Sequence, residues 1–460
     1  MSAMSKPFRK RKRIAVVGTF RSGKTVLLSS LINHIQVHDD TRFRIGSDGS
    51  AQIRKVSTLP LDEDEAPFPY EANRDALIHH GTWPVKTRDS SHHRMSFERT
   101  DWKAFDVELH LFDFPGERIA DVAVAVHESY DDWCDHVLGY IATQKEYRDL
   151  AQGYVAALEA AQPDEAELKR AYKEALASFI LNYKPMITPS TFLLDPHGTP
   201  GKGTTPQEVA TGRFAGLEPD ETRPEAGEFV PLTRELRETS PEMTQRFRLA
   251  YEYYRNQVVQ PLFRHLSRCH HLVVVTDVTT LLAGGTGMFN DNLKIVEDLF
   301  RVVRSKGLFS QLWESLLGLF GGIYGRLERV AFVATKLDLV AEPDRSRLRD
   351  LLREMTRHIA RDLDVPHEWF TASAIVSTQV PAANTRKLVG RLVWDPQTGE
   401  RLSPSDPPRE YTVSEMPERW PGMWGANEYS FPTVYPRWPQ NKAQVPDQIG
   451  LDALFEFLLS

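Results

Sequence analysis

Three short runs that are apolar almost throughout stand out along the chain, at residues 14–17, 272–276 and 330–334. Such runs, without polar alternation, are typical of strands that are buried on both faces of a parallel sheet. A fourth segment, 107–112, alternates apolar and polar positions, and residues 26–35 place leucine and isoleucine at helical spacing. Buried strands separated by helices predict an α/β fold, in which a parallel sheet carries helices on both faces.

The remaining pattern suggests how the chain is divided. Residues 36–104 are mostly polar and indicate loop with short elements, whereas helix formers dominate residues 119–183 and 243–266. Between them, residues 195–245 are rich in Gly, Pro, Thr and Glu, which predicts an irregular excursion. We therefore expect one domain from residues 14–118 and 267–460, a helical insertion at 119–266, and a basic N-terminal arm at 1–13.

Two further segments have unusual composition. Residues 378–447 contain eleven prolines and four of the nine tryptophans, which predicts an irregular segment packed on the main domain. Residues 308–324 carry an apolar stripe at helical spacing, which favours packing on the core or on a partner subunit; peripheral membrane contact is the alternative.

Composition narrows the class of protein. The 460 residues include 56 basic and 63 acidic side chains, a net charge of −7, which argues against a general nucleic-acid surface. Two cysteines cannot build a disulfide scaffold or a cysteine-rich metal site, so we expect a reducing compartment, the cytoplasm. We find no secretory signal pattern and no apolar window near the ~20 residues of a spanning helix.

The first buried run ends in a glycine-rich loop that matches the phosphate-binding pattern G-x-x-x-x-G-K-[ST]. Its residues are Gly18-Thr19-Phe20-Arg21-Ser22-Gly23-Lys24-Thr25. Glycines at these places let backbone N–H groups approach phosphate oxygens at a helix N-terminus. We expect Lys24 to reach the β- and γ-phosphates and the Thr25 hydroxyl to bind Mg²⁺.

A second motif follows the alternating segment, at Asp113-Phe114-Pro115-Gly116. A carboxylate at the end of that strand suits Mg²⁺, as the Walker-B acid does. The same four residues fit the D-x-x-G switch, in which the Gly116 N–H meets the γ-phosphate. A lone D-x-x-G is very common, and its place after an apolar strand gives it weight.

The third motif, Thr335-Lys336-Leu337-Asp338, concerns the base. It resembles the [TN]-K-x-D box, in which the Asp accepts hydrogen bonds from guanine N1–H and the 2-amino group. Adenine has neither donor, so such a site rejects ATP strongly. Lys336 would lay its aliphatic stem on the base, and Ser373-Ala374 resembles the S-A box near the guanine oxygen.

The switch-I threonine, which would complete the Mg²⁺ shell, is harder to identify. Thr87, in the segment Trp-Pro-Val-Lys-Thr, is our choice, and Thr82 and Thr58 are rivals. The predicted metal ligands are therefore Thr25, Thr87 and Asp113.

Five segments together resemble the YcjX family of bacterial GTP-binding proteins: RSGKT, WPxxT, DFPGE, PLFRHLSRCHHLVVVTDV and VAFVATKLD. The resemblance covers nearly the whole chain. It implies a P-loop GTPase domain interrupted by helical insertions, in the cytoplasm, with an association to stress responses. The nucleotide site that this implies comprises Gly18, Arg21, Ser22, Gly23, Lys24, Thr25, Val26, Asp113, Gly116, Thr335, Lys336, Asp338, Ser373 and Ala374.

Arg21 in the phosphate loop gives a second resemblance, to other families of GTP-binding proteins. Guanylate-binding proteins and atlastins have Arg at the position of Arg21, where it acts as a cis finger after dimerisation. The position after D-x-x-G is Glu117, which cannot donate a hydrogen bond while ionised. Arg21 is therefore our catalytic candidate beside Lys24 and Thr87; the alternative is an exposed loop residue, or one paired with Glu117.

Taken together, these motifs predict a GTPase that binds GTP and GDP with Mg²⁺ and acts as a nucleotide-dependent switch. The long insertion after Gly116 would contact a protein partner, and self-association as a homodimer would bring the finger into place. The alternatives are a nucleotide-gated interaction protein with negligible hydrolysis and an ATP-dependent P-loop enzyme.

Overall fold

The structure, a computed structural model, describes residues 8–19, 21–63, 65–85, 90–102, 104–127, 129–182, 205–210, 227–304, 327–381, 385–439, 441 and 444–460. These residues fall into two compact units. The first unit lies within Met1–Gly116, Arg268–Phe289 and Tyr324–Ser460, and the second within Glu117–Ser267 and Asn290–Ile323. The described residues 290–304 thus belong to the second unit and not, as expected, to the domain that carries the phosphate loop.

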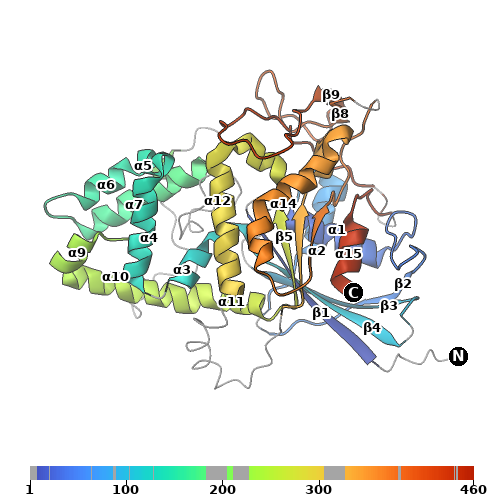
Figure 1. The fold of residues 1–460 in the computed structure, drawn as a ribbon, viewed down its shortest axis with the longest axis horizontal. Helices are drawn as coiled ribbons and strands as arrows, with labels where there is room; N and C mark the ends of the chain where they lie inside the picture. Colours follow the sequence, from blue (N-terminus) through green and yellow to red (C-terminus); the bar gives the residue numbers. More distant parts are fainter. Residues whose placement is uncertain are drawn as a thin grey trace. The chain divides into compact units, whose positions relative to one another are not determined.

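The first unit is built on a seven-stranded sheet with the order β2-β3-β4-β1-β5-β6-β7 (Figure 1). The strands β4, β1, β5, β6 and β7 run parallel, which confirms the predicted parallel sheet, and β3 and β2 are antiparallel additions at one edge. The strands are β1 (Phe8–Gly18), β2 (Ile53–Thr58), β3 (Ser91–Arg99), β4 (Phe105–Asp113), β5 (His271–Thr276), β6 (Arg329–Ala334) and β7 (His367–Thr371).

Helices of the first unit alternate with these strands, as the hydrophobic pattern predicts. They are α1 (Lys24–Gln36), α2 (Tyr70–Asp75), the π-helix η1 (Ala76–His80), α12 (Val278–Arg304, which continues into the second unit), the 3₁₀ turns η6 (Leu337–Leu339) and η7 (Glu342–Asp344), α14 (Arg345–Arg361) and α15 (Leu451–Leu459).

Both faces of the sheet are covered. On one face, alternate residues such as Val16, Val273 and Val333 pack in one core with leucines of α1 and α15, the red helix of Figure 1. On the other face, Phe332 stacks on Trp369, whose indole N–H donates to Thr356 of α14. Because the central strands bury side chains on both faces of the sheet, their sequences are continuous apolar runs.

Residues 36–104 form loops with short elements, as expected, and two of these elements, β2 and β3, extend the sheet. β3 buries Met95 and Phe97 in the core, and its buried arginine, Arg99, has two acidic partners. Arg99 is 2% exposed and binds Asp101 and Glu456 at 2.7 and 2.8 Å. Paired charges of this kind hide a strand from a hydrophobicity pattern.

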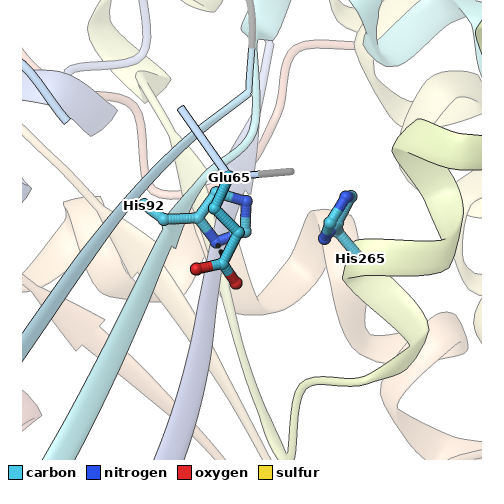
Figure 2. Close-up of side chains that lie close together, drawn as sticks. All are labelled: Glu65, His92 and His265. Atoms are coloured by element: carbon cyan, nitrogen blue, oxygen red, sulfur yellow. Dashed lines mark ion pairs between the residues drawn. The ribbon is translucent and has the colours of Figure 1, made fainter. Parts of the chain in front are cut away.

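A contact between a carboxylate and an imidazole links the chain segment before α2 to the same strand. Glu65 faces His92 of β3 in Figure 2, and their oxygen and nitrogen atoms lie 3.5 Å apart. The backbone nearby is bound as well, because the N–H of His92 donates to the carbonyl of Ala66.

The basic N-terminal segment also differs from expectation, because β1 begins at Phe8 and residues 8–13 are strand rather than a polar arm. Arg11 donates to Glu108 of β4 at 2.7 Å, and Lys12, 4% exposed, lies 3.7 Å from Glu328. These partners compensate the charges that would otherwise keep the segment in water.

The proline- and tryptophan-rich segment at 378–447 belongs to the first unit and carries a two-stranded sheet, β8 (Lys387–Gly390) and β9 (Arg409–Thr412). The indole N–H of Trp424 donates to the carbonyl of Leu282. Here α12 kinks at Gly285, which has φ +84, and a Cβ there would lie 2.9 Å from the backbone nitrogen of Ala426. Only glycine fits this approach without strain.

The second unit is helical in its described part. Its elements are η2 (Gly116–Asp121), α3 (Val122–Val126), α4 (Tyr130–Thr143), α5 (Lys145–Leu150), α6 (Gln152–Leu158), α7 (Glu165–Leu181), α8 (Pro206–Val209), α9 (Arg234–Thr239), α10 (Pro241–Tyr253), the π-helix η5 (Tyr254–Val259) and α11 (Gln260–Ser267). Aromatic rings fill its core; Trp133, for instance, is fully buried against Phe229 and Tyr251.

The remaining expectations concern the two cysteines, membrane-spanning helices and two segments of unusual composition. Each unit holds one buried cysteine, Cys269 in the first and Cys134 in the second. None of the helices in the described ranges is long and apolar enough to cross a membrane. The stripe at 308–324, the candidate for peripheral membrane contact, lies outside the described residues. Of the excursion expected at 195–245, residues 195–204 and 211–226 also lie outside them, whereas its last part is helical, in α9 and the start of α10, and corrects that expectation.

Candidate functional site

The predicted phosphate loop joins β1 to α1, and close backbone packing sets its shape. A Cβ on Gly18 would lie 2.2 Å from the carbonyl oxygen of Val275 on β5, so no side chain fits there. Gly23 has φ +91 and directly precedes α1, a conformation that favours glycine. Ser22 is fully buried, and its N–H donates to the Thr19 carbonyl at 3.3 Å. The N–H groups in the first turn of α1 therefore lie directly beside this tightly packed loop.

Lys24 folds over this loop. Its ammonium donates to the carbonyls of Gly18 and Thr19 at 2.8 and 3.0 Å, and the residue is 7% exposed. A buried ammonium ion requires such oxygen partners. This ammonium is the group that the sequence motif predicts to contact the β- and γ-phosphates.

Asp113 and Thr25 come together as the sequence predicts. Asp113 is the last residue of β4 and is 1% exposed, and the Thr25 hydroxyl donates to its Oδ2 at 3.3 Å. A hydroxyl and a carboxylate oxygen are hard donors of the kind that Mg²⁺ prefers. The donor set therefore fits the predicted metal.

Gly116 lies against the phosphate loop. A Cβ built on it would lie 2.3 Å from the Lys24 ammonium nitrogen and 3.1 Å from the carbonyl oxygens of Gly18 and Thr19. The absence of a side chain thus permits the D-x-x-G and the phosphate-binding motifs to touch. The second unit begins at the next residue.

The base-side loop, which follows β6 and carries the predicted base-binding motif, is hydrogen-bonded to the phosphate loop. The Thr335 hydroxyl donates to the Ser22 carbonyl at 2.7 Å, and the Thr335 N–H donates to Thr276 at 3.0 Å. Lys336 then adopts φ +60, a left-handed conformation uncommon outside glycine, and precedes η6. Backbone strain of this kind is concentrated at functional sites.

Asp338 lies in a network of donors. Its Oδ1 accepts from the Ser373 hydroxyl at 2.6 Å, and its Oδ2 accepts from the Ser377 N–H at 2.8 Å. Its own N–H donates back to the Ser373 hydroxyl at 2.8 Å, so the two residues fix each other. Burial raises the pKa of Asp338, against the opposing effect of these hydrogen bonds.

The S-A dipeptide joins the base-side loop to the phosphate helix. The Ser373 N–H donates to the carbonyl of Ile449, and the carbonyl of Ala374 accepts from the Ser30 hydroxyl of α1 at 2.5 Å. The structure therefore brings the TKxD and S-A motifs together, although they lie 35 residues apart in sequence.

Other predicted residues lie around this centre. Arg21 is exposed in the loop with φ +59, and Val26 packs beside an apolar cluster that contains Ile375 and Trp438. Thr87, the chosen switch-I threonine, lies outside the described residues. Its rivals are described: Thr58 is exposed at the end of β2, and the Thr82 N–H donates to the carbonyl of Ala76.

Asp277, Ser377 and Thr378 belong to this network but were not predicted as site residues. Asp277 follows β5 and binds Lys336, Ser377 binds Asp338, and the Thr378 hydroxyl donates to the Asp338 carbonyl at 2.6 Å. Only Asp277 carries a signal in the sequence, because it is a charged residue directly after a buried run, at the edge where parallel strands place function.

Comparison with known proteins agrees with the resemblance. The model of the YcjX-like family matches residues 12–460. A protein named Ras-like GTPase YcjX, from Escherichia coli (strain K12), is 23% identical over 97% of this chain and 95% of its own length. A protein of the same name from Shewanella oneidensis is 24% identical over 97% of this chain and 93% of its own. Because the family model spans almost the whole sequence, the chain belongs to the YcjX-like family.

Proposed function

We propose that this protein binds GTP and GDP with Mg²⁺, hydrolyses GTP to GDP and phosphate, and acts as a nucleotide-dependent switch. The observation that carries the proposal is the Asp338–Ser373 pair, held in a loop that Thr335 ties to the phosphate loop. A fixed carboxylate there would accept from guanine N1–H and the 2-amino group, donors that adenine lacks. The two relatives named Ras-like GTPase support guanine as the base.

The phosphate end of the site suits the same ligand. Lys24 would exchange its contacts with the Gly18 and Thr19 carbonyls for phosphate oxygens, beside the N-terminus of α1. Thr25 and Asp113 would hold Mg²⁺, which supplies positive charge against the β- and γ-phosphates when bound. The close fit of Gly116 against Lys24 would make the position of Gly116 depend on what occupies the loop.

Hydrolysis further requires charge neutralisation in the transition state. We assign this role to Arg21, with Lys24, and the remaining Mg²⁺ ligand to Thr87. A switch follows from the covalent connection of Gly116 to the second unit, which would offer its helices to a protein partner. The resemblance supports a cytoplasmic protein linked to stress responses, and the finger analogy supports a homodimer.

The residue after Gly116 favours a second candidate, a nucleotide-gated interaction protein with negligible hydrolysis. Glu117 stands where a water-orienting glutamine would be expected. Turnover of GTP by the purified protein with and without Mg²⁺ separates the two candidates.

The test of the base is direct. The nucleotide that co-purifies with the protein, identified by mass spectrometry, is expected to be GDP or GTP. In a titration, GDP is expected to bind more tightly than ADP. Equal affinities for GDP and ADP would overturn the assignment of guanine and favour an ATP-dependent enzyme.

A further inference from the structure

Asp277 belongs to none of the phosphate or base motifs, yet its carboxylate is densely bonded at the carboxyl edge of the sheet. It lies between β5 and α12 and is 5% exposed. Its Oδ1 accepts from the Thr279 hydroxyl at 2.6 Å and from the Thr280 N–H at 3.0 Å. Its Oδ2 accepts from the Thr280 hydroxyl at 2.5 Å. These bonds fix the carboxylate in one orientation.

The remaining partner of that carboxylate is Lys336, the lysine of the base-side motif. The Lys336 ammonium donates to Asp277 Oδ2 at 2.5 Å, and 32% of the lysine side chain stays exposed. Both ends of this lysine are therefore held: its backbone by the left-handed turn between Thr335 and η6, and its tip by Asp277.

We propose that Asp277 is a positioning residue for guanine binding, which holds the Lys336 ammonium so that the lysine stem is fixed along one side of the base site. This inference rests on the proposed function and deepens it. A lysine side chain loses considerable rotamer freedom when it is ordered. If an ion pair has already ordered it, less freedom is lost when the base binds, and the bound nucleotide leaves more slowly.

Electrostatics is consistent with an ionised pair. Burial alone would raise the pKa of Asp277, but the Lys336 ammonium and the threonine hydroxyls outweigh it, and the pKa is lowered. Asp277 is thus an anion near neutral pH, and Lys336 faces it directly.

The same carboxylate also caps α12, since it accepts from the Thr280 N–H, and this structural role must be separated from the proposed one. Asparagine caps helices about as well as aspartate but carries no charge. Asp277→Asn therefore keeps the cap and removes the ion pair. Asp277→Ser, another capping residue, serves as the second variant. Lys336→Met removes the ammonium and keeps an apolar stem.

The experiment measures release of a fluorescent GDP analogue from the full chain by stopped flow. Asp277→Asn and Lys336→Met are each expected to speed release about three- to tenfold, in the range of coupled neighbours. The double variant is expected to release no faster than the faster single variant, because both changes remove one interaction. A merely structural role of Asp277 would not depend on Lys336 in this way.

Asp344→Asn is the matched control. Asp344 is also buried, at 2% exposed, directly precedes α14 and pairs with Arg347 at 3.2 Å, but it binds none of the residues of the base-side motif among its described contacts. Its release rate is expected to match that of the unaltered protein. Circular dichroism on heating verifies that each variant is folded.

Two results would overturn the inference while leaving the proposed function intact. One is unchanged GDP release in both Asp277 variants; the other is rate increases that multiply in the double variant. If the unaltered protein does not bind GDP at all, the proposed function fails, and this inference with it.

Discussion

The hydroxyl of Thr335 donates a hydrogen bond to the backbone carbonyl of Ser22 at 2.7 Å, and so joins the base-side loop to the phosphate loop. Thr335 is 5% exposed, so its removal would leave the carbonyl poorly solvated. Thr335→Ala is expected to weaken GDP binding about fivefold, the equivalent of about 1 kcal/mol for one hydrogen bond. Thr335→Ser, which keeps the hydroxyl, is expected to bind like the unaltered protein. Calorimetric titration measures both, and equal affinities for all three proteins would contradict the coupling.

Lys24→Ala is expected to abolish nucleotide binding while the fold is kept. The substitution removes the charge that meets phosphate, and the contacts that it breaks, with the Gly18 and Thr19 carbonyls, lie within the phosphate loop itself. The measurements are GDP titration and thermal unfolding. Lys387→Ala, at an exposed lysine of β8, is the control and is expected to bind normally. Unchanged GDP affinity in Lys24→Ala would refute the phosphate-loop assignment.

Asp338→Asn is expected to weaken GDP binding at least tenfold, because an amide offers one acceptor oxygen where the carboxylate offers two. The Asp338 carboxylate already serves Ser373 and Ser377, so the substitution also disturbs the loop. Xanthosine diphosphate separates the two effects. Xanthine presents a carbonyl in place of the 2-amino group, and the amide N–H₂ of asparagine can donate to it. Relative affinity for xanthosine diphosphate should therefore rise in the variant; a parallel loss of both ligands would indicate loop damage alone.

Arg21→Ala tests the finger. A group that acts only in the transition state lowers kcat with little effect on GTP affinity. Fingers contribute about 10³–10⁵ in rate where they operate fully, so a loss of at least tenfold is expected. If self-association positions the loop, the specific rate should also rise with protein concentration. A rate independent of concentration, together with full activity of Arg21→Ala, would leave Arg21 as an ordinary exposed loop residue.

The sequence predicts the centre of the sheet well, for a physical reason. Strands such as β5 and β6 bury both faces, so their apolar runs are visible without knowledge of any partner. The loops after β1, β4 and β6 carry motifs whose chemistry depends on residue types at fixed spacing. The structure brings these loops together at one edge, as a parallel sheet requires.

The features that the sequence did not predict depend on contacts with residues far away along the chain. Arg99 is buried in β3 only because Asp101 and Glu456 neutralise it, and Glu456 lies 357 residues away. In the same way, the link from Asp277 to Lys336 spans 59 residues. A local pattern does not show a partner this far along the chain, which is why strands β2 and β3, the first half of β1 and the pairing of Asp277 with Lys336 were not predicted, although the place of Asp277 after a buried run was visible.

Because each unit contains one buried cysteine, the rate of thiol labelling at that cysteine can measure how often the unit opens. Burial raises the pKa of both thiols to about 12, so almost no reactive thiolate exists at neutral pH while either unit is closed. A disulfide exchange reagent should therefore label Cys134 only when the second unit opens, and Cys269 only when the first does. A ligand that binds the closed first unit shifts its opening equilibrium by mass action. GDP is accordingly expected to slow the labelling of Cys269, and mass spectrometry of the labelled peptides would read the two rates from a single sample.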